Sequence, residues 1–220
     1  MVDNEAPTIS CPSNITRDND PGACCAVVVY PTPVGSDNCP GATTKQTAGL
    51  PSGSTFPVGT TINTFVVTDA SGNQSSCSFT VTVNDNEPPV ITTNGQTPVL
   101  WPPNHTYHTF NVTDFVTAVS DNCGGVSIGD VVIQRVTSDE AENGPGSGNT
   151  LNDIVINAGC KSVQLRAERE NDADGRVYTI TFMLTDTHGN VTTKTSQVHV
   201  PKNLGVPAVD SGPHFTVTCP

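Results

Sequence analysis

The sequence is poor in positive charge, in aromatic residues and in long apolar runs. Its 220 residues include 9 Lys and Arg against 21 Asp and Glu, which gives a formal net charge of −12. A chain without a stripe of basic residues has little with which to displace phosphate counterions, so the composition argues against a nucleic-acid partner. The acidic surface is suited to solubility or to divalent cations.

Segments that cross or enter a membrane are missing as well. No apolar run is long enough to span a bilayer, and the start of the chain contains no signal-peptide pattern, so we expect no membrane insertion. We expect Met1 to begin a mature chain or an expressed fragment of a longer one.

Recognisable catalytic motifs are absent too. The sequence has no G-x-S-x-G elbow, no glycine-rich phosphate loop and no H-E-x-x-H pair. It therefore predicts a protein that is not an enzyme.

Cysteine, in contrast, is abundant, and no two cysteines have the C-x-x-C spacing of zinc or redox sites. We predict a disulfide framework formed in an oxidising compartment, and hence an extracellular or cell-surface protein. The predicted disulfide residues are Cys11, Cys24, Cys25, Cys39, Cys77, Cys123, Cys160 and Cys219.

The remaining composition predicts an all-β fold. Val and Thr recur throughout, and 18 Pro and 19 Gly separate short apolar runs at the spacing of a β-sandwich. In residues 78–83 apolar and polar side chains alternate, so Phe79, Val81 and Val83 should face a core.

Residues 84–89 interrupt this pattern with polar side chains and two prolines, as a short, stiff linker does. We predict two tandem β-sandwich domains, residues 1–86 and 87–203. Residues 204–220 are predicted as a tail or as the opening strand of a further repeat, because residues 215–220 resemble residues 8–12.

Two motifs recur in both predicted domains. Residues 36–39 (SDNC) return as residues 120–123, and residues 68–73 (TDASGN) return as residues 185–190 (TDTHGN). The second copy is the longer one, because it carries a glycine-rich, acidic insertion between these landmarks.

Residues 6–15, 36–39, 56–60, 67–73 and 77–81 together resemble the HYR (hyalin repeat) domain over about residues 4–86. The second domain resembles a bacterial immunoglobulin-like module through residues 100–105, 165–169 and 175–180. The resemblance implies immunoglobulin-like sandwiches in a secreted or cell-surface protein with a role in adhesion. It implies no catalytic residue and no particular ligand.

Sandwich geometry narrows the disulfide pairing without fixing it. The opening strand can lie beside the closing strand, which favours Cys11 with Cys77 and leaves Cys39 for Cys24 or Cys25. In the second domain we expect Cys123 with Cys160. Cys219 then meets the remaining Cys24 or Cys25 of the same chain or of a neighbour.

The linker is also a candidate metal site, since it is similar to the calcium-binding interdomain linker of cadherins. Calcium needs six to eight oxygen ligands, which clustered carboxylates, amides and carbonyls supply. The alternative is that Asp, Asn and Gly are there because they favour turns. The candidate ligands are Asn84, Asp85, Asn86 and Glu87, completed by Asp69 or by Asp172 and Asp174.

Trp101, the single tryptophan, is a candidate ligand-binding residue. An exposed Trp could stack on a sugar ring, whereas a buried one would anchor the domain junction, which is the reading we favour.

We therefore expect a non-catalytic spacer or adhesion module whose partners are other protein modules or cell-surface components. One alternative is a fibre subunit that joins its neighbours through residues 215–218 and Cys219 in a homo-oligomer. The other is a carbohydrate-binding accessory module.

Overall fold

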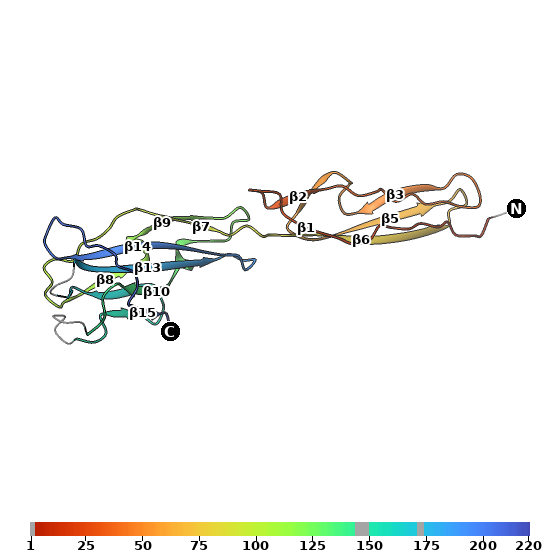
Figure 1. Cartoon of the computed structure of the whole chain (residues 1–220). Helices are drawn as coiled ribbons and strands as arrows, with labels where there is room; N and C mark the ends of the chain where they lie inside the picture. Colours follow the sequence, from red (N-terminus) through yellow and green to blue (C-terminus); the bar gives the residue numbers. More distant parts are fainter. Residues whose placement is uncertain (1–2, 144–149, 171–173) are drawn as a thin grey trace. The chain divides into compact units, whose positions relative to one another are not determined.

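The computed structural model describes residues 3–143, 150–170 and 174–220, so the predicted calcium ligand Asp172 lies outside the described residues. The chain divides into two compact units, Met1–Glu87 (unit 1) and Pro88–Pro220 (unit 2), at the predicted linker. Both units are built of β-strands, as predicted (Figure 1). Among the described residues, no helix is long and apolar enough to cross a membrane.

Unit 1 packs one four-stranded sheet against a short two-stranded one. The larger sheet has the order β1-β6-β5-β3, in which β1 runs parallel to β6, and the smaller sheet pairs β2 with β4. The strands are β1 (Ile15–Asp18), β2 (Cys25–Val28), β3 (Thr43–Ala48), β4 (Ser54–Pro57), β5 (Gly59–Thr68) and β6 (Gln74–Asn84).

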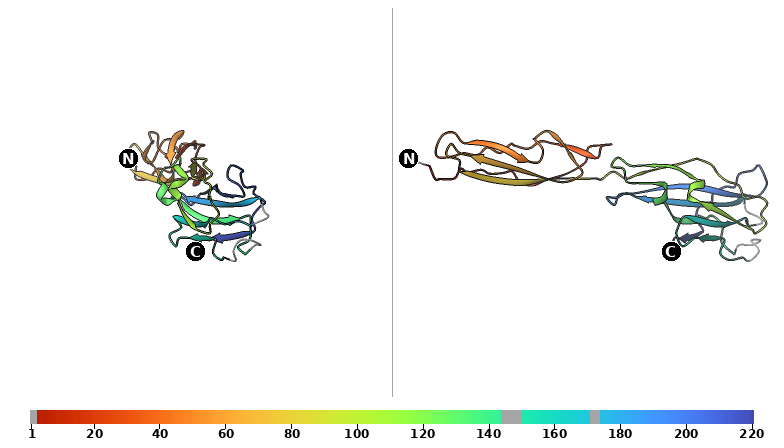
Figure 2. Two further views of the ribbon diagram at one scale, coloured as in Figure 1. Left: turned by 90° about the vertical axis from the view of Figure 1, so that its left-hand side faces the viewer. Right: turned by 180° about the vertical axis from the view of Figure 1, so that it is seen from behind.

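The β5–β6 hairpin spans unit 1 from end to end (Figure 1 and Figure 2). Because β6 has 11 residues, its ends lie about 30 Å apart. Phe79, Val81 and Val83 of β6 are buried, as the alternation predicts. They pack in a core with Tyr30, whose ring lies edge-on to that of Phe79 at 4.9 Å between centroids.

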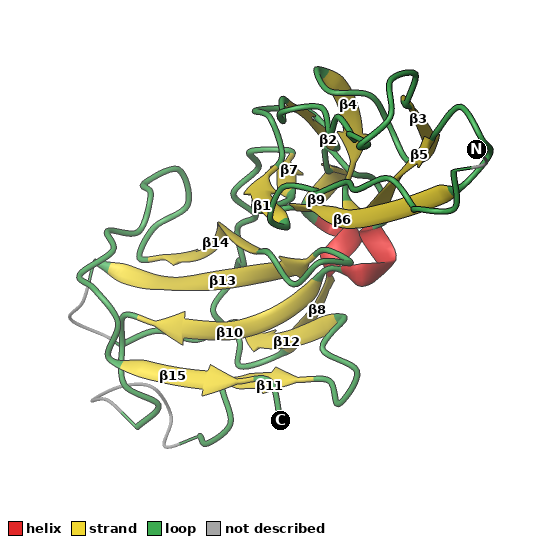
Figure 3. Cartoon of the chain, turned by 90° about the vertical axis from the view of Figure 1, so that its right-hand side faces the viewer, coloured by secondary structure: helices red, strands yellow, loops and turns green. Residues whose placement is uncertain are grey.

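Unit 2 is the larger sandwich. One sheet has the order β14-β13-β10-β15, whose strands lie side by side in Figure 3, and the facing sheet has the order β11-β12-β8. A further pair, β7 with β9, completes the described strands of the unit. Their bounds are β7 (Val90–Thr93), β8 (Tyr107–Asn111), β9 (Val116–Ser120), β10 (Val132–Ser138), β11 (Ile154–Ile156), β12 (Ser162–Arg166), β13 (Gly175–Thr185), β14 (Val191–Pro201) and β15 (Phe215–Thr218). Short 3₁₀ turns lie at Val112–Asp114 and Ile128–Asp130.

The last strand belongs to this sandwich. β15 pairs antiparallel with β10, and Phe215 and Val217 pack against the core of unit 2. The structure therefore places residues 215–218 within unit 2, where they are already paired, and not in a free strand available to a neighbouring chain.

The disulfides correct part of the predicted pairing. Cys11 bonds Cys77, as expected, whereas Cys160 bonds Cys219 and not Cys123. The reason is the β10–β15 pairing, because Cys219 N–H donates to Gln134 O while Cys160 O accepts from the neighbouring Ile133 N–H.

Cys25 and Cys39 are free thiols, which contradicts their predicted place in the disulfide framework. They lie at opposite ends of unit 1. Cys25 O accepts from Asp20 N–H beside the Asn84 end of β6, whereas Cys39 lies with Asp3 near Asn73, at the start of β6. A separation of about 30 Å rules out a bond between them.

Candidate functional site

The repeated TDxxGN motif forms the same turn in both units. In unit 1, Asp69 Oδ1 accepts the backbone N–H of Ser71 and of Asn73 at 2.9 and 2.8 Å, and Asp69 Oδ2 accepts the Asn73 side-chain amide at 2.8 Å. Burial works to raise the pKa of Asp69, but these bonds hold it below its ordinary value.

Asp186 has equivalent bonds in unit 2. Its Oδ1 accepts from the backbone N–H of His188 and Asn190 at 2.8 and 2.9 Å, and its Oδ2 accepts the Asn190 side-chain amide at 2.8 Å. The pKa of Asp186 is likewise lowered by these bonds against the effect of burial. Both carboxylates thus close a turn.

The SDNC motif is a second shared turn. Cys39 N–H donates to Asp37 Oδ1 at 2.9 Å, and Cys123 N–H donates to Asp121 Oδ1 at 2.8 Å. The agreement shows that the sequence repeat reflects a repeated backbone geometry.

In each unit these turns bring acidic side chains together. In unit 1, ligand atoms of Asp3, Asp37 and Cys39 all lie within 4.8 Å of one another. In unit 2, carboxylate oxygens of Asp121 and Asp186 lie within the same distance. Asp121 Oδ2 is buried and accepts no hydrogen bond among the described residues.

The sequence analysis did not predict that Asp3 and Glu5 contact the two shared turns of unit 1. Asn73 donates its side-chain amide to the backbone oxygens of both residues at 3.2 Å, and Asn38 donates to Glu5 Oε2 at 2.6 Å. A signal was present, because residues 3–5 (DNE) recur as residues 85–87.

The predicted linker ligands are held by unit 1 itself. Asn19 N–H donates to Asn84 O at 2.9 Å, Asn86 N–H donates to Asn19 Oδ1 at 3.2 Å, and Gly22 N–H donates to Glu87 Oε1 at 2.7 Å. Asp85 Oδ1 accepts from Glu87 N–H at 3.3 Å. The linker residues therefore form an ordered extension of unit 1.

Asp69 cannot complete a calcium shell with these residues. Its turn precedes β6, whereas Asn84 ends β6, so the two lie about 30 Å apart. This part of the predicted metal site is wrong, because the hairpin runs the full length of unit 1. Asp174 is exposed in unit 2, where it lines a pocket with Asp139, Glu140 and Glu170.

A buried ionic network forms the densest polar cluster of unit 2. The fully buried guanidinium of Arg176 pairs with Glu140 at 3.1 Å and with Asp153, which also pairs with Arg166 at 3.2 Å. Burial raises the pKa of Glu140 and opposes the charge on Arg176, but Tyr178 and Asp153 hold the pKa of Arg176 above its ordinary value. The network ties the start of β13 to segments on both sides of the insertion, a structural role.

Trp101 is 39% exposed, so the expected buried anchor is wrong. Its peptide bond to Pro102 is cis, and the preceding Leu100 donates its N–H to His199 O on β14 at 2.8 Å. Trp101 is therefore partly exposed, and the residue before it is hydrogen-bonded to β14. Its role in binding stays a prediction.

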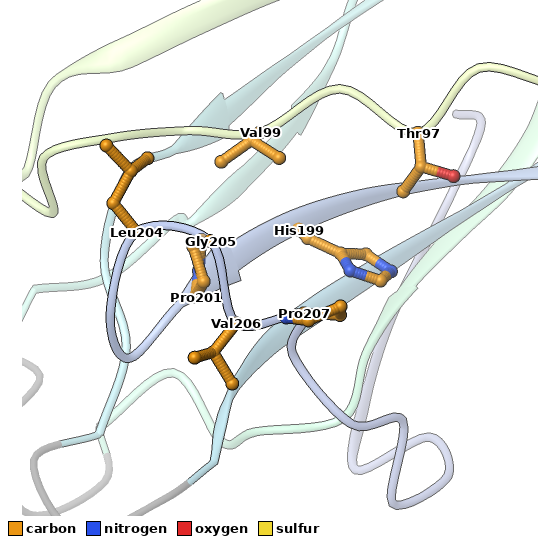
Figure 4. A pocket seen from close by; sticks show the side chains of 8 residues that line it. All are labelled: Thr97, Val99, His199, Pro201, Leu204, Gly205, Val206 and Pro207. Carbon is orange, nitrogen blue, oxygen red and sulfur yellow. The ribbon is translucent and has the colours of Figure 1, made fainter.

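An apolar pocket of about 420 Å³ lies in unit 2 between the segment before Leu100, β14 and the loop that follows β14 (Figure 4). Only Thr97 and His199 interrupt the apolar lining, and burial lowers the pKa of His199. The other lining residues are Val99, Pro201, Leu204, Gly205, Val206 and Pro207. Sequence reasoning did not find this pocket.

The comparisons with known proteins bear on unit 1. Residues 2–83 match the HYR domain family. The match covers the residues whose motifs predict it and includes both the SDNC and TDASGN turns. The resemblance of unit 2 to a bacterial immunoglobulin-like module is supported by no family match and stays a prediction.

Curated relatives share the HYR stretch. Hyalin of Strongylocentrotus purpuratus is 34% identical over 93 residues, which cover 41% of this chain and 8% of hyalin. The "Sushi, von Willebrand factor type A, EGF and pentraxin domain-containing protein 1" of Mus musculus is 39% identical over 93 residues, 40% of this chain and 2% of that protein. The chain thus spans a small fraction of the relatives it matches.

Solved structures with a similar β-sandwich fold include the human mucin-like protocadherin EC1-2. It is 10% identical, with a TM-score of 0.42 over 88% of this chain and 98% of that one. At this score the likeness is loose, and nothing below rests on it.

Proposed function

We propose that this chain is a non-catalytic, stiff spacer of adhesion type in a secreted or cell-surface protein. The main observation is the linker, whose residues Asn84 to Glu87 are hydrogen-bonded to the Asn19–Gly22 turn of unit 1. Two prolines, Pro88 and Pro89, follow at once and restrict the backbone further. A linker held in this way transmits orientation from one module to the next.

Other observations support an extracellular, structural role. The Cys11–Cys77 and Cys160–Cys219 disulfides require an oxidising compartment. The carboxylates of Asp69 and Asp186 close the repeated TDxxGN turns through hydrogen bonds, and those of the ionic network are paired with arginine. Such groups stabilise a scaffold, and they are not arranged as a nucleophile with its base.

Calcium is the cation that this scaffold fits best. The carboxylates of Asp121 and Asp186 lie close together, and the buried Oδ2 of Asp121 has no hydrogen-bond donor among the described residues. A divalent cation would supply the missing positive charge, with backbone carbonyls and water completing its oxygen shell. Asp85 and Glu87 remain ligands predicted from the sequence alone.

The test is thermal unfolding of the full chain with calcium and with a chelator. We expect calcium to raise Tm in the native sequence and to have no effect on Asp121→Asn. The Asn side chain can still accept the Cys123 N–H through Oδ1, so this variant removes the charge and keeps the turn. Asp210→Asn is the control, because Asp210 is exposed and accepts a hydrogen bond from Gln197 of β14. This variant should respond to calcium as the native chain does. A Tm that is unchanged by calcium in the native chain would exclude this site.

The exposure of Trp101 favours one second candidate, a carbohydrate-binding accessory module. Aromatic faces pack against the apolar face of a sugar ring. A glycan array probed with the native chain and with Trp101→Ala tests it, and binding that survives the substitution would remove this candidate.

A further inference from the structure

The apolar pocket of unit 2 is surrounded by side chains that are exposed although they are apolar. Val99, Leu204 and Val206 line it and are 52%, 67% and 56% exposed. Single exposed apolar side chains are ordinary, but three around one cavity of about 420 Å³ form a surface on which a small molecule can bury its own apolar area. The hydrophobic effect therefore favours occupation of this pocket.

The edge of β14 beside the pocket is already paired, which excludes an added strand as the occupant. His199 N–H donates to Pro98 O at 2.9 Å, and Leu100 N–H donates to His199 O at 2.8 Å. A peptide that extends a sheet needs free backbone groups at the edge it joins. The occupant is therefore a molecule that contacts the side chains of the pocket and not its backbone.

The pocket has a polar end and an apolar end. Figure 4 shows Thr97 and His199 at one end and Leu204 at the other, with Val99 between them. Among the described residues, no Lys or Arg lines the pocket. A ligand that matches this lining is uncharged and mostly apolar, and it carries a polar group at one end.

The hydrogen bonds around His199 determine which polar group fits. Gln197 Nε2 donates to Asp210 Oδ2 at 2.9 Å, and Gln197 Oε1 faces His199 Nε2 at 3.5 Å. Because the amide oxygen can only accept, His199 Nε2 is the ring nitrogen that carries the proton. Burial lowers the pKa of His199, which favours the neutral ring, and in that ring Nδ1 is an acceptor.

This acceptor is the nitrogen that faces the pocket. Figure 4 shows one ring nitrogen of His199 on the side of Pro207 and the other turned away from Val206 and Pro207. Nε2 contacts Gln197, which does not line the pocket, so the nitrogen on the side of Pro207 is Nδ1. The ligand must therefore supply a hydrogen-bond donor at the polar end.

We propose that the pocket binds a small, neutral, apolar molecule that carries one hydroxyl group, such as a phenol. The hydroxyl donates to His199 Nδ1, and the apolar part packs between Val99, Leu204 and Val206. A cavity of roughly 150 Å³ holds one benzene ring, so about 420 Å³ is sufficient for a molecule of two rings. A carboxylate would meet an acceptor nitrogen and no basic side chain, which excludes anionic ligands. This site depends neither on the spacer role nor on the calcium site proposed above.

The first test compares β-naphthol with its methyl ether, which has the same rings and the same oxygen atom but no donor. Each compound is titrated into the full chain, and the amide signals of Thr97, Val99, Gly205 and Val206 are followed by NMR. We expect saturable shifts at these amides and an affinity about fivefold higher for the naphthol, the contribution of one hydrogen bond. The absence of saturable shifts, or an equal affinity for the ether, would overturn the proposal.

Variants assign the two ends of the ligand to their contacts. His199→Phe keeps an apolar ring and removes Nδ1, so it should bind both compounds with equal affinity. Val206→Ser removes apolar lining and should weaken both by roughly threefold or more. Val191→Ser is the matched control, because Val191 is similarly exposed but does not line the pocket, and should bind as the native chain does. A preference for the naphthol that survives in His199→Phe, or native affinity in Val206→Ser, would refute this assignment.

Discussion

Asn190 donates its side-chain amide to the carboxylate of Asp186 at 2.8 Å, and the backbone N–H of the same asparagine donates to the other oxygen at 2.9 Å. Asn190 thus donates to both oxygens of the Asp186 carboxylate. The two residues are the first and last of the turn that joins β13 to β14. Asp69 and Asn73 repeat the arrangement between β5 and β6. The last hairpin of each unit is therefore closed by the same pair of side chains.

This pair predicts a dependence of stability on pH. The pKa of Asp186 is lower in the folded chain than in the unfolded one, where it is about 4. The ionised carboxylate therefore stabilises the fold at pH values above the unfolded pKa. That contribution is lost as the pH falls through the lower, folded pKa. Asp186→Asn should lower the free energy of unfolding by about 1 kcal/mol at neutral pH and by less in acid. Denaturant unfolding at about pH 7 and about pH 3 measures both values, and an equal loss at the two would contradict this account.

Arg176 predicts a large effect of removing one buried charge. Arg176→Met leaves Glu140 and Asp153 buried without their guanidinium partner, and we expect a loss of about 3 to 5 kcal/mol in unfolding free energy. Lys194→Met on β14 is the control, since Lys194 is exposed, and should change stability by less than about 0.5 kcal/mol. Similar small losses for both variants would show that the network contributes little.

Gly175 has a φ of +108°, and an added Cβ would lie 2.8 Å from both the Ala208 Cβ and the Val200 carbonyl oxygen. Gly189 has a comparable φ of +94° with nothing within 4 Å of its Cβ position. Gly189→Ala therefore reports backbone strain alone, about 1 kcal/mol or somewhat more, and Gly175→Ala should cost clearly more because Ala208 must move. Equal Tm values for the two variants would disprove this close packing.

Cys11 and Cys77 predict how far unit 1 depends on its disulfide. The bond closes a loop with a sequence separation of 66, and its loss in Cys11→Ala with Cys77→Ala should cost about 2 to 5 kcal/mol. Hydrogen exchange, read separately for the amides of each unit, should show the loss of protection in unit 1 and not in unit 2. Equal loss in both units would contradict the division into two cores.

Local alternation predicted the strand at residues 78–83, which lies in β6, whereas pairings between distant strands did not follow from local patterns. Alternation placed Phe79, Val81 and Val83 in the core, because a strand with one buried face repeats every second residue. The partner of Cys219 depends on β15 pairing with β10, a contact between segments far apart in sequence. Sequence spacing carries no signal for such a pairing.

The polar clusters likewise differ in whether they depend on local or on distant contacts. The turns around Asp69 and Asp186 repeat a local motif and were visible as a sequence repeat. The buried ionic network of Arg176 depends on distant contacts, because Asp153 and Glu140 enter it from other segments of the chain.

A stiff spacer must hold its two units in one mutual arrangement, and this claim is tested most directly by the width of a distance distribution between spin labels, one in each unit. Labels placed at exposed Thr193 and Ser76 positions, in a chain with Cys25→Ser and Cys39→Ser, would report it in calcium. We predict a single narrow distribution that broadens when Pro88 and Pro89 are both replaced by glycine. A broad distribution in the native linker, unchanged by those replacements, would contradict it.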